Sequence, residues 1–367
     1  MIRVLHVLGG LNVGGAETMV MNYYRNIDRN KIQFDFIIHT REHQVYYDEI
    51  KMLGGIIYSF PKFNGKNIRL VKKNWATFFK NHPEYKIMHS HVRSYASIYL
   101  PIAKKYGVKT IIHSHSTSNG RGILSIIKRI LQYPIRYQAD YFMACSKKAG
   151  EWLFGRKVVN SRFFYILKNA INLNQFMFNE TIRNDYRAKL NVDSNTIVFV
   201  HVGRFHPSKN HTFLINLFYE YNKYNPNSKL LLIGDGELRA DIESLISSLC
   251  LKESVVLLGN RKDVCNYLQA SDCFLFPSKW EGLPVAVIEA QAAGVPCLIS
   301  NVITKEVSIS NLVQCVAIDK GCILWLELLK KMDYSRHNVI DIIKNAGFDI
   351  IESAKWLESF YNSIERY

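Results

Sequence analysis

Residues 196–210 read TIVFVHVGRFHPSKN, and this stretch decides the fold because it restarts, halfway along the chain, the pattern with which the chain begins. Its apolar and β-branched run, 196–202, predicts a buried strand that ends at a glycine turn. The start of the chain, IRVLHVLGGLNVGG at residues 2–15, has the same order of strand and glycine-rich turn. Two such starts predict an α/β protein with two Rossmann-like halves.

Further strand-like runs follow each start, and helical stretches separate them. They lie at residues 34–40, 86–91, 108–115 and 140–146 in the first half, and at 229–236, 254–260, 272–278 and 296–300 in the second. This alternation predicts βαβ units and a parallel sheet in each half. Polar residues and Asn-rich turns replace the strand pattern after residue 172, so we place the domains at 1–172 and 173–349.

The last residues, 348–367, predict a final helix. Its apolar residues recur at helical spacing, so one side of the helix should be buried; they are Ile350, Ile351, Trp356, Leu357, Phe360 and Tyr361. Periodicity alone leaves two interpretations open. Residues 350–367 either pack back on the first domain or cap their own domain.

The composition is that of a folded, soluble protein. Of the 367 residues, 48% are hydrophobic and 21% are charged, which argues against disorder, collagen and coiled coil. No apolar run is long enough for a membrane span, and the apolar start is too short for a signal peptide. The seven cysteines are scattered without a CxxC pair, as expected for thiols in a reducing cytosol. We therefore expect a cytoplasmic protein.

The net charge of +16 is concentrated in the first half of the chain. Residues 1–172 hold 27 Lys and Arg against 9 Asp and Glu, whereas residues 173–367 hold 20 against 22. Such asymmetry predicts an anionic partner for the first half, which leaves nucleic acid, a phosphorylated substrate and an anionic membrane surface as the alternatives.

Two turns have features of an anion site. The glycine-rich turn with Gly14 and Gly15 follows a strand and precedes a helix, so backbone N–H groups can approach an anion there; a tight turn without a ligand is the alternative. In the second half, Arg204 and Lys209 follow the strand at 196–202, where open α/β sheets bind ligands. These two cations are suited to clamp a diphosphate.

The stretch at residues 277–290, PSKWEGLPVAVIEA, carries two carboxylates. It predicts a loop with Glu281 and a helix from Val285 that bears Glu289. Carboxylates beside exposed helix N–H groups are suited to hold sugar hydroxyls while the helix end takes phosphate. An acid/base pair, as in glycosidases, and a helix cap beside a surface glutamate remain the alternatives.

Histidines are the residues most suited to a metal site in this sequence. His89 with His91, and His113 with His115, are close pairs whose members share a face of a strand. No third ligand is placed nearby in the sequence, so we expect no metal.

Taken together, several motifs resemble those of family 4 glycosyltransferases of GT-B fold, in the expected order along nearly the whole chain. They are GGAE at 14–17, HSHST at 113–117, LKNAINLNQF at 167–176, VGRFHPSKN at 202–210, LLIGDGE at 231–237 and SKWEGLPVAVIEAQAAGVP at 278–296. The likeness is greatest to bacterial enzymes of capsular and exopolysaccharide assembly. The resemblance implies two Rossmann-like domains that face each other across a cleft.

The resemblance also implies roles for individual residues. Glu281 would bind the donor hexose and Glu289 the ribose, while Arg204 and Lys209 would bind the diphosphate. The remaining donor-site residues are Gly14 and Gly15 from the opposite domain, Asn260 and Arg261 at the base, Gly282 and Leu283, and Val285 and Ala286 at the phosphate. His115 would face the transferred sugar and the acceptor, which makes it a catalytic candidate with Glu281, Arg204 and Lys209.

The chemistry implied is transfer with retention of configuration from a nucleotide-diphosphate sugar, most simply a UDP-sugar. The sequence contains no Asp-x-Asp pair, the metal-diphosphate anchor of the other major glycosyltransferase fold. We therefore expect no cofactor and no metal, with the leaving diphosphate neutralised by Arg204, Lys209 and helix N–H groups. A nucleotide-sugar epimerase or a phosphorylase of similar fold is the alternative enzyme.

The acceptor is expected to be a glycan, most simply one linked to a lipid diphosphate. Two stretches, 66–80 and 121–137, combine apolar residues with Lys and Arg, as in helices that lie on an anionic membrane. For 66–80, a domain helix with its apolar side in the core is the favoured interpretation. A nucleic-acid-binding protein would also explain the basic half, but no zinc finger, RNP or helix-turn-helix signature is present, and we expect no nucleic acid.

Overall fold

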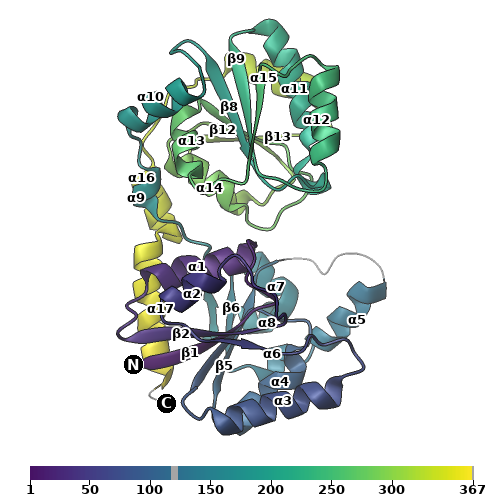
Figure 1. Ribbon diagram of the computed structural model, residues 1–367, viewed down its shortest axis with the longest axis vertical. Coiled ribbons are helices and arrows are strands. Elements are labelled where there is room, and N and C mark those ends of the chain that lie inside the picture. Colours follow the sequence, from purple (N-terminus) through teal and green to yellow (C-terminus); the bar gives the residue numbers. More distant parts are fainter. Residues whose placement is uncertain (117–122, 366–367) are drawn as a thin grey trace. The chain divides into compact units, whose positions relative to one another are not determined.

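The computed structural model contains two α/β units, each built on its own parallel sheet (Figure 1). It describes residues 1–116 and 123–365, with side chains of the second range from Ser125 onwards. The first unit consists of residues 1–171 and 349–367, and the second of residues 172–348. The predicted fold class, two Rossmann-like βαβ domains, is confirmed.

Parallel strands in the order β3-β2-β1-β4-β5-β6-β7 form the sheet of the first unit. Their bounds are β1 Ile2–Val7, β2 Ile32–Ile38, β3 Ile57–Ser59, β4 Ile87–Ser90, β5 Lys109–Ser114, β6 Tyr141–Ala144 and β7 Phe164–Ile166. The strand order reverses at β1, which has β2 on one side and β4 on the other. Ligands of such sheets bind at this switch point, outside the carboxyl ends of the strands.

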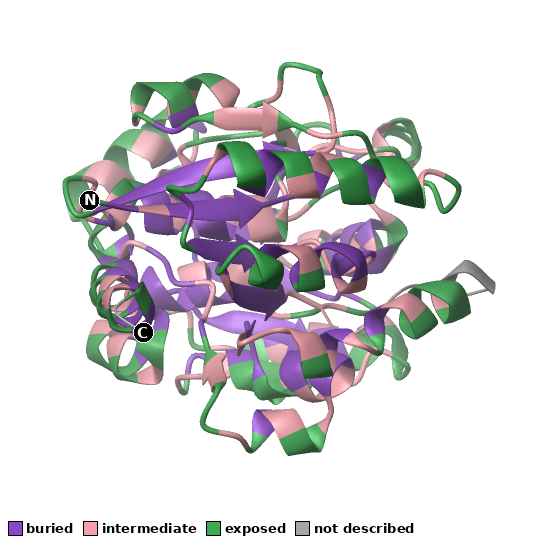
Figure 2. Ribbon diagram, turned by 90° about the horizontal axis from the view of Figure 1, so that it is seen from below, coloured by how far each residue is buried: buried purple, intermediate pink, exposed green. Residues whose placement is uncertain are grey.

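Helices cover both faces of this sheet. They are α1 Gly15–Asn26, α2 Tyr47–Met52, α3 Ile68–Asn81, α4 Ala96–Lys105, α5 Ile123–Gln132, α6 Ile135–Gln138, α7 Lys147–Phe154, α8 Arg156–Val159 and α17 Ile350–Glu365. Alternate residues of β1 enter different cores: Val4 packs with α1 and α17, and Leu5 packs with α3 and α4. Figure 2 shows the result, with buried strands at the centre and exposed outer surfaces on the helices.

The stretch at 66–80 forms α3, and its apolar stripe is a core stripe. Val71, Trp75, Phe78 and Phe79 are buried against the sheet, and Trp75 is fully enclosed. Ile68 is the exception, with 39% of its surface exposed, because the first turn of the helix extends past the core. The favoured interpretation of this stretch, a domain helix with its apolar side in the core, is therefore confirmed for every residue of the apolar stripe except Ile68.

The stretch at 121–137 divides into α5 and α6. The two helices meet at Pro134, which has no N–H to continue the first helix. Residues 117–122, which include Thr117 of the HSHST motif and Arg121, lie outside the described residues. Ile126, Ile127 and Ile130 are exposed on α5, so this helix has an apolar side that its own unit leaves uncovered.

The last helix, α17, belongs to the first unit and packs on α1. Glu358 accepts a hydrogen bond of 2.7 Å from the backbone N–H of Asp28, and the hydroxyl of Tyr361 lies 2.6 Å from His89 Nδ1 in β4. The buried side holds four of the expected residues, Ile350, Leu357, Phe360 and Tyr361. Ile351 and Trp356 are each 39% exposed, because they lie at the edge of the helical stripe.

The second unit repeats the plan with strands in the order β10-β9-β8-β11-β12-β13. The strands are β8 Ile197–Val202, β9 Ser228–Ile233, β10 Val255–Gly259, β11 Cys273–Phe276, β12 Cys297–Ser300 and β13 Val313–Val316. The helices are α9 Leu173–Phe176, α10 Glu180–Lys189, α11 His211–Tyr224, α12 Arg239–Ser248, α13 Val264–Ala270, α14 Val285–Ala292, α15 Gly321–Lys331 and α16 Ile340–Ile343, with short turns η1 Pro207–Lys209, η2 Lys305–Val307 and η3 Lys344–Phe348.

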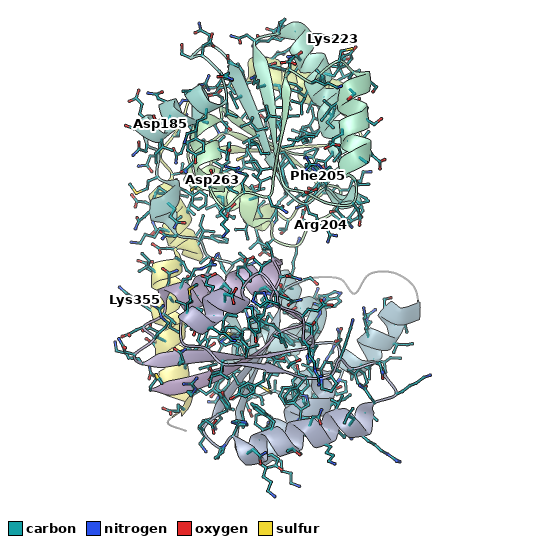
Figure 3. The ribbon with its side chains drawn as sticks, in the orientation of Figure 1. Asp185, Arg204, Phe205, Lys223, Asp263 and Lys355 are labelled. Carbon is teal, nitrogen blue, oxygen red and sulfur yellow. The ribbon has the colours of Figure 1, made fainter. Side chains whose placement is uncertain are left out.

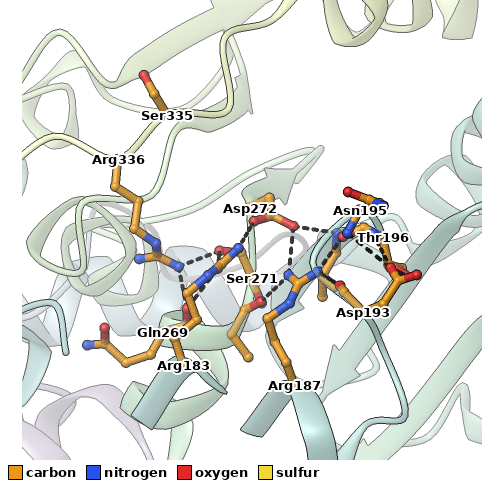
Figure 4. A network of polar contacts seen from close by, with 12 residues as sticks. Arg183, Arg187, Asp193, Asn195, Thr196, Gln269, Ser271, Asp272, Ser335 and Arg336 are labelled. Atoms are coloured by element: carbon orange, nitrogen blue, oxygen red, sulfur yellow. Dashed lines mark hydrogen bonds and ion pairs between the residues drawn. The ribbon is translucent and has the colours of Figure 1, made fainter. Parts of the chain in front are cut away.

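A buried polar network fastens α10 and the segment before α16 to this sheet (Figure 4). Asp272, just before β11, forms ion pairs of 2.6 Å with Arg183 and 3.2 Å with Arg187. It also accepts a hydrogen bond of 2.8 Å from the backbone N–H of Val198. Arg336 donates to carbonyl oxygens in the last turn of α13 and to that of Ser271 after it. Arg187 is buried and Arg183 is partly exposed, so loss of Asp272 would leave the Arg187 guanidinium as a buried charge without its carboxylate.

Candidate functional site

The candidate site of the second unit lies at the carboxyl ends of β8 and β11. These strands are parallel neighbours, so the loops that follow them meet at the same edge of the sheet. Lys209 ends the turn after β8, and Glu281 lies in the loop after β11. Their side chains form an ion pair with 2.7 Å between Nζ and Oε1, and they are only 17% and 14% exposed. Two residues singled out from the sequence are therefore in direct contact.

The backbone of these loops is closely packed. Gly234, at the end of β9, has a φ of +139°, and a Cβ built on it would lie 2.2 Å from the carbonyl oxygen of Gly203. Glycine is therefore required at this position. The N–H of Lys279 donates to the carbonyl of Ser208 across 2.7 Å, which ties the loop after β11 to the turn after β8. The hydrogen bond between the two loops therefore lies next to Lys209 in one loop and close to Glu281 in the other.

Arg204 has different surroundings from Lys209. Its side chain is 69% exposed at the end of β8 (Figure 3), and the nearest carboxylate is that of Glu237 at 4.0 Å. The two cations thus have separate acidic neighbours, Glu237 and Glu281. Lys209 is therefore held in a part-buried ion pair, whereas Arg204 is exposed, and the predicted joint clamp of these two cations on a diphosphate stays a prediction.

The other glutamate of the motif, Glu289, lies on α14 as predicted. Pro284 precedes the helix, so the first free backbone N–H groups are those of Val285 and Ala286. Gly282 and Leu283 form the turn between Glu281 and the helix. Burial raises the pKa of Glu289 to about 7, since the surrounding protein disfavours its charged form.

Asn260 and Arg261 follow β10, and Arg261 is engaged within its own loop. Its guanidinium contacts the carboxylate of Asp263 through distances of 3.0 and 3.1 Å, and Tyr186 donates to the same carboxylate across 2.7 Å. Burial raises the pKa of the nearby Cys265 thiol, and the charge of Glu289 adds to the shift. The helix that follows this loop therefore lies beside α14, and the role of Asn260 and Arg261 at the base stays a prediction.

In the first unit, the glycine turn leads directly into α1. Gly14 is the N-cap of the helix, and a Cβ there would lie 2.4 Å from the Glu17 carboxylate. Gly15 is exposed, and a Cβ built on it meets no atom within 4 Å. Local packing does not require glycine at residue 15, which is consistent with an approach by a ligand to its backbone.

His115 comes directly after β5, at the same edge of the first sheet as the glycine turn. Its Nε2 lies 2.8 Å from Nδ1 of His91. Burial lowers its pKa to about 3, so the imidazole is neutral near pH 7.

The structure corrects the argument from the sequence that the paired histidines lack further histidine neighbours. Strand pairing brings five histidines together on one face of β1, β4 and β5; they are His6, His89, His91, His113 and His115. Two sets of three have ligand atoms within 4.8 Å of one another. The sequence shows that the two histidines of each pair share a face of their strand, because i and i+2 residues do so. It does not show which strands are neighbours, and that order is what brings the pairs together.

Two family models match the chain and together cover most of it. "Glycosyltransferase Family 4" matches residues 13–175, and "Glycosyl transferases group 1" matches residues 182–324. No helix in the described ranges is both long enough and apolar enough to cross a bilayer.

Similar proteins span nearly the same length. EpsF of Bacillus subtilis, which carries the name of a glycosyltransferase, is 32% identical over 98% of this chain and 96% of its own. An Escherichia coli galactosyltransferase, named for UDP-Gal and for N-acetylglucosamine on diphosphoundecaprenol, is 28% identical over 67% of this chain and 66% of its own. The solved structure of Anabaena HepE with UDP and glucose has a TM-score of 0.75 at 15% identity, over 99% of this chain and all of HepE.

Proposed function

The chain belongs to the family 4 glycosyltransferases, and on that premise we propose that it transfers a hexose or N-acetylhexosamine from a UDP-sugar to a lipid-diphosphate-linked glycan. The reaction would retain the configuration at the anomeric carbon. Its place would be the assembly of a capsular or other cell-surface polysaccharide, on the cytoplasmic side of the membrane.

The observation that carries this proposal is the contact between Lys209 and Glu281, in the loops that precede α11 and α14. The ammonium group of Lys209 would supply the counter-charge that a leaving diphosphate needs. Glu281 offers carboxylate oxygens to sugar hydroxyls, and Glu289 offers them to the ribose. A cation and two carboxylates at one edge of the sheet match the two ends of a nucleotide sugar.

Arg204 and the start of α14 supply the remaining positive potential. Because Arg204 is exposed and its acidic neighbour is 4.0 Å away, its guanidinium is free to turn onto a phosphate. The N–H groups of Val285 and Ala286 point out of the first turn of the helix, where anions are stabilised. With these groups the leaving diphosphate is neutralised by the protein's own charges, so we propose transfer without a metal.

The first unit would supply the acceptor side. Gly14 and Gly15 would bring backbone N–H groups to the diphosphate, and His115 would face the transferred sugar. The acceptor hydroxyl would attack the face that the diphosphate leaves, with the departing phosphate accepting its proton.

The proposal of a lipid-linked acceptor rests on α5. Ile126, Ile127 and Ile130 are exposed there beside Lys128 and Arg129, in the half of the chain that carries the excess positive charge. Apolar side chains flanked by cations are typical of helices that lie on anionic lipid surfaces. We place this side of the first unit at the inner leaflet.

A donor screen with an acceptor-dependence test decides the proposal. Thermal shifts with UDP, GDP and their common sugars should show stabilisation by a UDP-sugar, and UDP should be released only when acceptor is added. Glu281→Gln should lose most of the turnover, whereas Glu243→Gln, an exposed carboxylate on α12, should not. UDP release without acceptor, or interconversion of free sugar nucleotides, would instead identify a hydrolase or an epimerase.

A further inference from the structure

The five buried histidines of the first unit form two chains. In one, His6 Nδ1 lies 3.0 Å from His91 Nε2, and His91 Nδ1 lies 2.8 Å from His115 Nε2. In the other, the hydroxyl of Tyr361 lies 2.6 Å from His89 Nδ1, and His89 Nε2 lies 3.2 Å from His113 Nδ1. The distances within each chain are those of hydrogen bonds.

The ring geometry shows that these contacts are directed along the rings. The centroids of His6 and His91 are 5.3 Å apart and their planes differ by 9°, so the centroid separation exceeds the N···N distance by about two ring radii. The same holds for His89 and His113, at 5.4 Å and 14°. In both pairs the rings meet end-on and nearly coplanar, as required for an N–H of one ring to point at the lone pair of the next.

This geometry distinguishes the chains from a metal site. A zinc ion needs the nitrogen lone pairs of its ligands to converge on one point about 2.0 Å from each. Here the paired nitrogens face each other directly at 2.8 to 3.2 Å, with no space for an ion between them. Contacts between the chains are ring stacks, such as His113 over His115 at 4.1 Å and 18°.

Each imidazole in these chains has one proton to share. Burial lowers the pKa of His6 and of His115 to about 3, and that of His91 well below its usual range, so all three are neutral near pH 7. A neutral imidazole donates from one nitrogen and accepts at the other. Once one ring in the chain has chosen its tautomer, the hydrogen bonds determine the tautomer of the next.

The two ends of the His6–His91–His115 chain are not equivalent. His6 Nε2 is buried beside the ring of Phe34, with centroids 4.1 Å apart, and finds no hydrogen-bond partner in the described part of the chain. A proton there would be a buried donor without a partner among the described residues, which is unfavourable. The other end, His115 Nδ1, is also buried without a partner among the described residues, but it follows β5, at the sheet edge where ligands of open α/β sheets bind, so a bound sugar could supply the missing acceptor.

We propose that His91, backed by His6, is a positioning residue that fixes His115 as the tautomer protonated on Nδ1, ready to donate to an oxygen of the transferred sugar. In this arrangement, the Nδ1–H of His6 donates to Nε2 of His91, and the Nδ1–H of His91 donates to Nε2 of His115. This inference rests on the proposed function for the identity of the sugar ligand. The tautomer itself can be measured in the free protein.

The test reads the tautomer directly, through ¹⁵N-histidine NMR of the full chain. His115 is assigned as the signals lost in His115→Asn, and in wild type its Nδ1 should carry the proton. His91→Phe keeps a ring but removes both hydrogen bonds, so the Nδ1 and Nε2 signals of His115 should shift toward a mixture of tautomers. His91→Gln, which retains one donor and one acceptor, should restore much of the wild-type signal.

Turnover provides the second measurement. His91→Phe should lower kcat by roughly tenfold, since about one hydrogen bond to the substrate is at stake, with less effect on KM for the donor. The matched control is His89→Phe, because His89 is also buried and lies two residues earlier, in β4, but belongs to the Tyr361–His89–His113 chain. It should leave the His115 signals unchanged.

Three results would overturn the proposal. They are a wild-type His115 protonated on Nε2, equal spectral changes in His91→Phe and His89→Phe, and a stoichiometric metal in the purified protein. If the wild type shows no acceptor-dependent release of UDP while Nδ1 of His115 is protonated, the proposed function fails and the tautomer assignment stands, because the spectrum is measured without substrate.

Discussion

Glu289 offers the sharpest test of the donor site, because its ionisation and its binding role are linked. Burial raises its pKa to about 7 from an ordinary value of 4.5. The folded protein therefore holds a proton on this group between those two pH values, where the unfolded chain has lost it. Stability should fall as pH rises through this window, and Glu289→Gln should remove that fall.

The size of the effect follows from the shift. Each unit of pKa corresponds to about 1.4 kcal/mol, so between about pH 5 and pH 8 the wild type should lose about 2 to 3 kcal/mol of stability relative to Glu289→Gln. Donor binding should have the opposite dependence on pH. Ribose hydroxyls donate to an ionised carboxylate. As the pH is raised toward 7, the affinity for the donor should therefore increase about tenfold per pH unit, and above pH 7 it should stay constant.

The assay is a titration with UDP-glucose at a series of pH values, beside urea unfolding of the free protein under the same conditions. A UDP-sugar is preferable to UDP, whose terminal phosphate itself titrates near pH 6, by analogy with phosphate monoesters. Glu289→Gln should bind more weakly than wild type above pH 7, with no dependence on pH. The reasoning is refuted if the wild-type affinity is flat with pH, or if the Gln variant keeps the slope.

Three further predictions concern stability, catalysis and lipid. Asp272→Asn should destabilise the second unit by about 3 kcal/mol in urea unfolding, since it leaves the buried guanidinium of Arg187 and the partly exposed one of Arg183 without their carboxylate; the exposed Asp185→Asn is the control, and equal effects would contradict the network. Lys209→Met should lower kcat by about a hundredfold in a UDP-release assay, against little change in Lys223→Met on the exposed end of α11. The full chain should sediment with anionic liposomes at low salt and release at high salt; no binding at low salt removes the membrane proposal.

Much of the fold was predictable because long strands carry a strong local signal. The runs at 2–8 and 196–202 became β1 and β8, and both lie in the middle of their sheets, where burial on two faces demands continuous apolar sequence. The strands missed from the sequence are the short ones, β3, β7 and β13, which lie at sheet edges. An edge strand of three or four residues has one neighbour and little apolar sequence, so its pairing is decided by the sheet beside it.

The sequence predicted which residues lie in the candidate site, but not which side chains contact one another there. The spacing of Glu281 and Glu289 placed one before a helix and one within it, as the structure shows. That Lys209 would pair with Glu281, and Arg204 lie apart, depends on loop geometry after β8 that no periodicity reports. In the same way, Asp263 engages the side chain of Arg261 through a contact between residues two apart in a loop.

The histidine chains show most clearly what strand order adds to sequence. On one face of the first sheet, apolar residues give way to histidines toward the carboxyl end of each central strand: Val4 to His6 in β1, Ile87 to His89 in β4, and Ile111 to His113 in β5. A sheet that needed only a core would continue the apolar face, since burying polar rings lowers stability unless they are hydrogen-bonded. The rings are bonded to one another end-on, which meets that requirement for part of their nitrogens and leaves His6 Nε2, His113 Nε2 and His115 Nδ1 without a partner among the described residues. The His6–His91–His115 chain runs from the interior to the edge where we propose that the substrate binds. The change from apolar residues to histidine therefore marks where the core ends and the proposed chemistry begins.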